Sequence, residues 1–342
     1  MKRIVGRALS VGASKFATAF ALFVFPAISA VAQDAPPAPH PHITFHSSSH
    51  LVLVDVVALN AKNGLPDKTL KREDFQVFDN GHPVSIKTFD SGAQFTTRPL
   101  SLWFVVQCAM PGWEKEGSGL FAGQIDRLKP ALQSLENQDT VAVAHWCDDG
   151  QSKLDLLPTS NVDQAATSLE QVLATTLNSD GHDRPGELAL QSTLQLIVDE
   201  TRTVKPEPVP VLIFLYGDYS AMPRSEADHF IGELLETSAV AYGLRDRRSP
   251  RIWSLGEQGA IANYIATQTG GEYLRVTPET YAKGLEEILL QLHGRYELGF
   301  KPEVLDGKRH KLLVTLADAA KSQHKRVRLR HRLAYVPTGT AN

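Results

Sequence analysis

A nearly uninterrupted apolar run, residues 100–113, constrains the fold of this chain more than any other feature. It is rich in leucine, valine and aromatic residues and ends in a Pro-Gly turn. A short apolar run bounded by turn residues is typical of a strand buried on both faces, which usually lies at the centre of a parallel sheet. Ligands of such sheets bind where the carboxyl ends of the strands open into loops. The loop that begins at Gln107 is therefore the expected functional position, although residues 107–112 contain no carboxylate and no hydroxyl.

The chain after residue 99 alternates between strand and helix patterns, which favours an α/β domain with a mostly parallel sheet. Further strands are predicted at 141–146, 209–215, 239–244 and 272–276, with a short edge strand at 154–157. Helices with an apolar stripe are predicted at 120–135, 162–173, 190–198 and 227–235, and two further helices at 260–268 and 279–292. Ser225 and Asp228 fit a capping box at the start of the fourth of these helices.

Two β blocks flank this domain, at residues 50–95 and 294–337. Their predicted strands are 50–59, 75–78, 84–89, 296–300, 311–316 and 326–333, and Asn80-Gly81 predicts a two-residue hairpin. Each block, at about 50 residues or fewer, is too small to bury a core easily by itself. We therefore expect both blocks to pack together as one discontinuous β-sandwich, with the α/β domain, residues 96–293, inserted between them.

The N-terminal segment, residues 1–32, has the pattern of a cleaved secretory signal. Basic residues precede an apolar stretch of about ten residues, and Ala-Val-Ala follows at 30–32. The apolar stretch is shorter than the roughly 20 residues that a membrane-spanning helix needs. Residues 33–49 form a Pro-rich linker and residues 338–342 a short tail. We therefore expect an exported protein, periplasmic or extracellular, with no membrane span in the mature chain.

The charge pattern argues against nucleic acid as a partner and indicates a different kind of anionic partner. With 35 Lys and Arg residues against 38 Asp and Glu residues, the chain is not expected to bind nucleic acid. An alternating segment near the C-terminus places Arg326, Arg328, Arg330 and Arg332 on one face of a strand. This basic patch could dock an anionic partner such as a cell-surface polysaccharide or an acidic protein face. The alternative is a solvated strand face whose like charges discourage edge-to-edge aggregation.

Several segments together resemble von Willebrand factor type A (VWA) proteins, and more narrowly the exported VWFA-related proteins typical of acidobacteria. These segments are Val-Asp-Val-Val at 54–57, Leu-Lys-Arg-Glu-Asp-Phe-Gln-Val-Phe-Asp-Asn-Gly at 70–81, Pro-Leu-Ser-Leu at 99–102, Thr-Gly-Gly at 269–271, Arg-Tyr-Glu-Leu-Gly-Phe at 295–300 and Asp-Gly-Lys-Arg-His-Lys at 306–311. The resemblance rests on their order and spacing over residues 50–337. It implies an α/β domain with a doubly wound, mostly parallel, Rossmann-like sheet and a metal-ion-dependent adhesion site at the top of that sheet.

The implied adhesion site holds a divalent cation through an Asp-x-Ser-x-Ser motif after the first strand, a threonine in a second loop and an aspartate in a third. Such a cation takes oxygen ligands in octahedral geometry and leaves one position for a carboxylate of the partner. The corresponding positions here are Gln107, Ala109 and Pro111, then Glu187, and then Asp218, which is displaced along its loop. The first three cannot supply anionic or hydroxyl oxygens, so we expect the site to be degenerate and no metal to be bound.

The two cysteines, Cys108 and Cys147, follow strands that are neighbours in the sheet order of the resembling fold. Parallel neighbours lie about 4.8 Å apart, near the lower limit of the Cα separations that a disulfide accepts. A disulfide in the exported protein and two buried free thiols are both open interpretations. A redox or metal role with His145 and Asp148 has no Cys-x-x-Cys motif to support it.

The sequence contains no motif typical of a catalytic site. It has no Gly-x-Ser-x-Gly turn, phosphate loop or zinc-protease helix, and Ser220 lies in Gly-Asp-Tyr-Ser-Ala. We therefore predict a non-enzymatic, adhesion-type interaction module without a cofactor, whose partner is a protein or a cell-surface ligand. One alternative is a metal-dependent adhesin whose cation is held in a rearranged site by Asp180, Asp183, Glu187 and Asp218. A less favoured alternative is an enzyme of unknown type.

Overall fold

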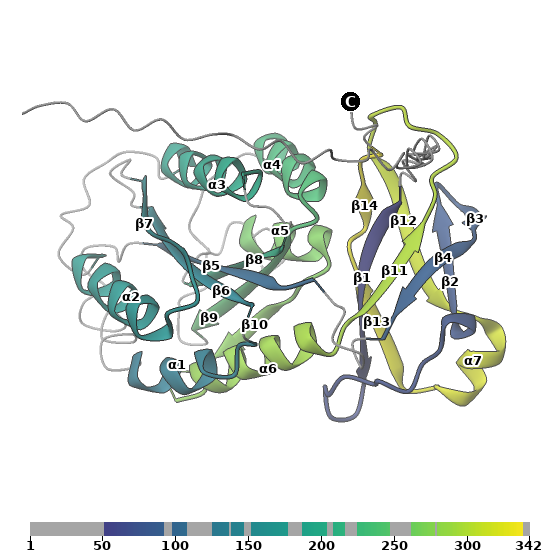
Figure 1. The fold of residues 1–342 in the computed structure, drawn as a ribbon, viewed down its shortest axis with the longest axis horizontal. Coiled ribbons are helices and arrows are strands. Elements are labelled where there is room, and N and C mark those ends of the chain that lie inside the picture. Colours follow the sequence, from purple (N-terminus) through teal and green to yellow (C-terminus); the bar gives the residue numbers. More distant parts are fainter. Residues whose placement is uncertain are drawn as a thin grey trace, which may run out of the picture. The chain divides into compact units, whose positions relative to one another are not determined.

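The computed structural model describes residues 51–91, 98–107, 125–136, 138–146, 152–176, 187–203, 208–215, 224–246, 261–277 and 279–337 (Figure 1). All of these residues belong to one unit, Ser48–Asn342. The predicted signal peptide, the Pro-rich linker and the C-terminal tail lie outside the described residues.

A six-stranded sheet forms the centre of the α/β part, in the order β10-β9-β8-β5-β6-β7 (Figure 1). Its strands are β5 (Leu100–Gln107), β6 (Thr140–Trp146), β7 (Ser152–Thr159), β8 (Val209–Leu215), β9 (Val240–Asp246) and β10 (Tyr273–Val276). All neighbouring strands are parallel except β6 and β7, which are antiparallel. The sheet is therefore mostly parallel, and it is compatible with a VWA fold.

Strand β5 is the central strand, as the apolar run predicts. It pairs with β6 along one edge and with β8 along the other, and residues 102–106 are 0% exposed. Successive side chains of a strand point to opposite faces of the sheet. Accordingly, Leu102 and Phe104 belong to one hydrophobic cluster, whereas Trp103 and Val105 belong to another. A strand that serves both clusters must be apolar at almost every position, which explains the unbroken pattern.

Helices cover both faces of this sheet, so the sheet is doubly wound (Figure 1). The cluster that contains Phe104 also draws on α1 (Ile125–Leu132), α2 (Val162–Thr176) and α6 (Tyr281–His293). The cluster that contains Trp103 draws on α3 (Glu187–Thr201), α4 (Arg224–Glu236) and α5 (Ile261–Thr269). Each of the helices predicted from apolar stripes overlaps one of these helices.

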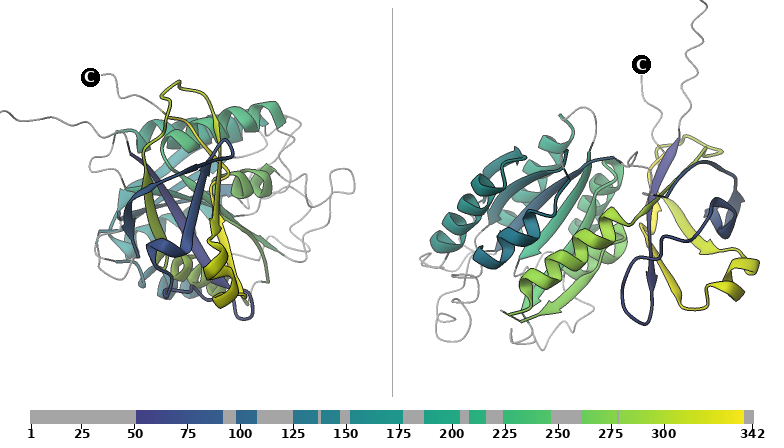
Figure 2. Two further views of the ribbon diagram at one scale, coloured as in Figure 1. Left: turned by 90° about the vertical axis from the view of Figure 1, so that its right-hand side faces the viewer. Right: turned by 60° about the horizontal axis from the view of Figure 1, so that its bottom comes forward.

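Strands from the two ends of the chain pair with each other in two four-stranded sheets, β13-β1-β11-β4 and β14-β12-β2-β3. Their bounds are β1 (Val52–Asn60), β2 (Phe75–Asp79), β3 (His82–Val84), β4 (Ile86–Asp90), β11 (Tyr296–Phe300), β12 (His310–Leu316), β13 (Val327–His331) and β14 (Ala334–Tyr335). Figure 2 shows the purple N-terminal strand beside the yellow C-terminal ones. One hydrophobic cluster, which includes Val54, Phe75, Tyr296 and Val314, draws on both sheets.

The N-terminal block divides between these two sheets at Ser85. The predicted hairpin at Asn80-Gly81 is confirmed, because β2 pairs with β3 and the two turn residues have φ angles of 49° and 87°. The strand predicted at 84–89 is confirmed for residues 86–89, which belong to β4, but this strand is not the hairpin partner of β2. Strand β3 ends at Val84 against β2, whereas β4 begins at Ile86 and pairs with β11 in the other sheet. The two strands follow different partners, and local sequence does not specify partners.

Two short helical segments complete the β part, η1 (Arg72–Asp74) and α7 (Asp318–Gln323). The second is absent from the sequence prediction. This helix could not be predicted from periodicity, because α7 buries only Ala320 and therefore has no apolar stripe.

Candidate functional site

The candidate site is the edge of the six-stranded sheet at which β5, β6 and β8 end. In the register of the sheet, Val106 is paired with Leu215 of β8 and Gln107 with Trp146 of β6. The chain proceeds from β5 to β6 on one side and later returns to β8 on the other side. This reversal of strand order is the switch point at which open α/β sheets bind their ligands.

Most of the residues predicted from the sequence for the adhesion site and the disulfide lie outside the described residues. Gln107 is the last residue of β5 and Glu187 is the first residue of α3, and only their backbone is described. The remaining positions, namely Cys108, Ala109, Pro111, Cys147 and Asp218, lie outside the described residues. The structure therefore brings together the strand ends from which the predicted loops start, and the predicted ligand set and disulfide stay predictions.

Helix α3 is attached to β6 close to this edge. The Thr193 hydroxyl donates a hydrogen bond of 3.2 Å to the carbonyl oxygen of His145, and both residues are buried. The His145 ring in turn lies with Nδ1 2.6 Å from Oδ2 of Asp155 on β7. His145 is thus engaged with the edge strand, which explains its burial without any redox role.

A polar cluster in the first turns of α4 and α5 was not anticipated from the sequence. The Tyr264 hydroxyl donates to Oδ1 of Asp228 at 2.5 Å, and the Arg224 guanidinium lies 4.0 Å from the centre of the Tyr264 ring. Burial, followed by the hydrogen bond to Asp228, raises the pKa of Tyr264. Asp228 does not act in a capping box with Ser225, because α4 already begins at Arg224. The contact joins two helices, so no local pattern could have indicated it.

The predicted basic patch does not form one surface. Arg326 and Arg328 are exposed, but Arg330 is half-buried and donates to the Glu272 carboxylate and to the Gln291 side chain. Arg332 is only 7% exposed. The physical reason is that β13 ends at His331, so the alternation does not extend to Arg332. The prediction of four arginines on a solvated face is corrected to two.

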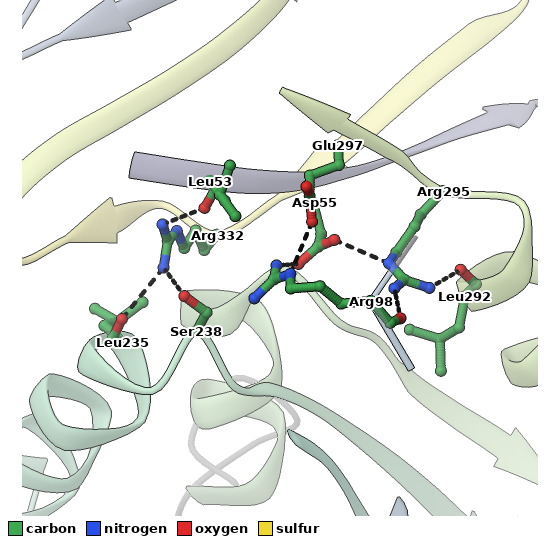
Figure 3. Close-up of polar contacts among 9 residues, drawn as sticks. All are labelled: Leu53, Asp55, Arg98, Leu235, Ser238, Leu292, Arg295, Glu297 and Arg332. Atoms are coloured by element: carbon green, nitrogen blue, oxygen red, sulfur yellow. Dashed lines mark hydrogen bonds and ion pairs between the residues drawn. The ribbon is translucent and has the colours of Figure 1, made fainter. Parts of the chain in front are cut away.

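A second charged group lies where the chain passes between the β strands and the α/β part (Figure 3). Arg295 donates from Nε to Oδ1 of Asp55 at 2.9 Å, and it also donates to the carbonyl oxygens of Leu292 and Arg98. Arg98 donates to Oδ2 of Asp55 at 3.0 Å and to Glu297 at 2.8 Å. One carboxylate, that of Asp55, therefore binds two arginines.

Arg332 lies in the same region, and its hydrogen bonds within the described part of the chain go to neutral groups (Figure 3). Its Nη1 donates to the carbonyl oxygen of Leu235 at 3.2 Å and to the Ser238 hydroxyl at 3.1 Å, and its Nη2 donates to the carbonyl oxygen of Leu53 at 2.6 Å. Burial lowers the pKa of Arg332 to about 10. The guanidinium is therefore still protonated at neutral pH.

Comparisons with known proteins give a likeness in fold only. No protein-family model matches the sequence, and no curated protein matches it. Solved structures do. The chain is similar to a von Willebrand factor type A protein from Catenulispora acidiphila, with 11% identity and a TM-score of 0.43 over 81% of this chain and 77% of that chain. It is also similar to BatB from Bacteroides thetaiotaomicron, with 14% identity and a TM-score of 0.41 over 56% of this chain and 98% of that chain.

A third similar structure is an aerotolerance-related membrane protein from Bacteroides fragilis, with 13% identity and a TM-score of 0.39 over 56% of this chain and 98% of that chain. At such low identities and TM-scores, these likenesses carry no argument about function. Within the described ranges, no helix is long and apolar enough to cross a membrane. In the same part of the chain, no group of three or more His, Cys, Asp or Glu side chains is placed to hold a metal ion.

Proposed function

We propose that the chain is an exported, non-enzymatic interaction module of the VWA type whose metal-ion-dependent adhesion site is degenerate. The observation that carries the proposal is the position of β5. Its carboxyl end lies between β6 and β8 at the switch point of the sheet, and neither its last residue, Gln107, nor residues 108–112 include a carboxylate or a hydroxyl. The chain has the strand arrangement that would present a cation and lacks the side chains that would hold one.

The donor chemistry at the predicted ligand positions does not fit a divalent cation. Magnesium demands near-octahedral oxygen coordination, and calcium needs six or more oxygen ligands. Gln107 offers one neutral amide oxygen, whereas the side chains of Ala109 and Pro111 contain no oxygen at all. The segment that follows β5 instead contains Cys108 and Met110, and methionine is a side chain that adapts to many apolar surfaces.

The proposal also includes a cellular location, a family and a second domain. The charge and hydropathy pattern of residues 1–32 supports export to the periplasm or beyond. The order of motifs over residues 50–337 supports membership in the VWFA-related proteins typical of acidobacteria. The hydrophobic cluster that draws on both four-stranded sheets supports a β-sandwich. The partner in this proposal is a protein or a cell-surface ligand.

Isothermal titration calorimetry of the mature chain, residues 33–342, with Mg²⁺, Ca²⁺ and Mn²⁺ tests the degenerate site. We expect no binding in the micromolar range, because three ligand positions lack suitable oxygens. The matched variants are Asp218→Ala, at the third predicted loop, and Asp163→Ala, an exposed carboxylate of α2. Micromolar binding by the native chain that disappears in Asp218→Ala but persists in Asp163→Ala would refute the proposal and favour a metal-dependent adhesin with a rearranged site.

A further inference from the structure

A small cavity lies between the amino-terminal end of the parallel sheet and strand β1, away from the candidate site. Its volume is about 20 Å³, and its lining includes Asp55, Tyr242, Thr269, Leu292, Arg295 and Arg332. A cavity needs roughly 10–15 Å³ of such volume to hold one water molecule. This cavity therefore has room for a single small occupant and excludes tetrahedral oxyanions and organic acids.

The charged groups around this cavity are not balanced. The Asp55 carboxylate is shared between Arg295 and Arg98, with N···O distances of 2.9 and 3.0 Å. Arg332 forms no ion pair with any carboxylate among the residues that the structure describes, and its hydrogen bonds go to two carbonyl oxygens and one hydroxyl. Burying a cation without a negative partner is unfavourable. The cavity lining thus carries two guanidinium groups and a single carboxylate.

Two donors on the lining residues have no partner in the described part of the chain. They are Nε of Arg332 and the hydroxyl of Tyr242, and both atoms are buried. Tyr242 is 0% exposed. Burial raises the pKa of the Tyr242 hydroxyl, so this group keeps its proton and can donate. Buried donors in folded proteins are nearly always satisfied, so these two indicate an acceptor inside the cavity.

We propose that this cavity binds one small monovalent anion, such as chloride, through the Arg332 guanidinium and the Tyr242 hydroxyl. Both groups are donors, and the excess charge of the lining is positive, which favours an anion over a water molecule. The anion supplies the negative charge that Arg332 lacks. The site stabilises the contact between the β strands and the α/β part and is independent of the candidate site at the opposite end of the sheet.

Thermal unfolding of the mature chain at constant ionic strength tests this site. Chloride or bromide salts replace gluconate salts step by step, and gluconate is the reference because it is too large for the cavity. We expect the Tm to rise with chloride and then saturate, as for a ligand that binds only the folded state. Tyr242→Phe removes one donor to an ion, so the chloride concentration at half-saturation should increase by about tenfold or more. Arg332→Met should abolish the response, whereas Arg328→Met, an exposed arginine of the same β segment, should leave it unchanged.

If Arg332→Met fails to fold, the chloride response of Tyr242→Phe still tests the proposed anion site. An equal Tm in chloride and gluconate, or an unchanged chloride response in Tyr242→Phe, would overturn the proposal. Crystals grown in sodium bromide give a direct check, because bromide scatters anomalously and water does not. We expect a peak in the anomalous difference map beside Nε of Arg332. Electron density at that place without an anomalous signal would show that the cavity holds water.

Discussion

At the scale of single residues, the Asp55 carboxylate links the two points at which the chain enters and leaves the α/β segment. Arg98 lies shortly before β5, where the chain enters this segment, and Arg295 lies just before β11, where the chain leaves it. Both guanidinium groups bind the Asp55 carboxylate. Arg295 is only 1% exposed, so it depends on this carboxylate for its charge balance. The Asp55 carboxylate should therefore contribute more to the stability of the fold than an ordinary half-buried carboxylate does.

Asp55→Asn should therefore lower the free energy of unfolding by about 3 kcal/mol, because it leaves the buried Arg295 cation without a negative partner. Urea denaturation followed by circular dichroism measures this change. The control is Asp163→Asn, whose side chain is 77% exposed and whose loss should cost less than about 1 kcal/mol. Equal effects of the two substitutions would show that the shared carboxylate has no special role.

At the scale of secondary-structure elements, Asp139 connects β5, β6 and α6. Its Oδ1 accepts a hydrogen bond of 2.7 Å from the backbone N–H of Leu100, and its Oδ2 accepts one of 3.0 Å from the N–H of Glu136. Nε2 of His293 lies 2.9 Å from the same Oδ2. Burial alone would raise the pKa of Asp139, but these hydrogen bonds outweigh it and lower the pKa from its ordinary value of 3.8.

This lowered pKa predicts a specific pH dependence of stability. As the pH falls, the unfolded chain takes up a proton on Asp139 before the folded chain does. The stabilisation is therefore complete above the unfolded pKa of 3.8 and is lost as the pH falls through the lower folded pKa. Urea denaturation at several pH values below about 5 should show a shallower loss of stability in Asp139→Asn than in the native chain. Identical slopes in the two proteins would exclude Asp139 as a source of the pH dependence.

At the scale of the whole molecule, the sequence predicts buried strands better than the points at which strands bend and end. Strand β8 has the predicted bounds, 209–215, because every one of its residues is buried and the apolar run of the sequence covers the same residues. The corner at Ser85 and the end of β13 at His331 depend on partners elsewhere in the chain. Arg332 therefore enters the interior, although a continued alternation would leave it on the surface.

The candidate site is predictable to the level of strand ends. The apolar runs that form β5 and β8 indicate which loops share an edge, because parallel strands present their carboxyl ends together. Contacts between elements cannot be predicted in this way. The hydrogen bond between Tyr264 and Asp228 and the sharing of Asp55 by two arginines join residues far apart in sequence. Neither leaves a local pattern that could be read from the chain.

We propose that the chain binds its partner at the carboxyl edge of the parallel sheet without a divalent cation. Capture from an envelope extract by the immobilised mature chain, in Mg²⁺ and in EDTA, tests it most directly. The matched variants are Met110→Glu, in the loop after β5, and Leu313→Glu, at a residue of β12 that is 53% exposed. We expect equal capture of the same partner in Mg²⁺ and in EDTA. Met110→Glu should strongly reduce this capture, and Leu313→Glu should leave it unchanged. Capture that is lost in EDTA, or that survives Met110→Glu, would contradict it.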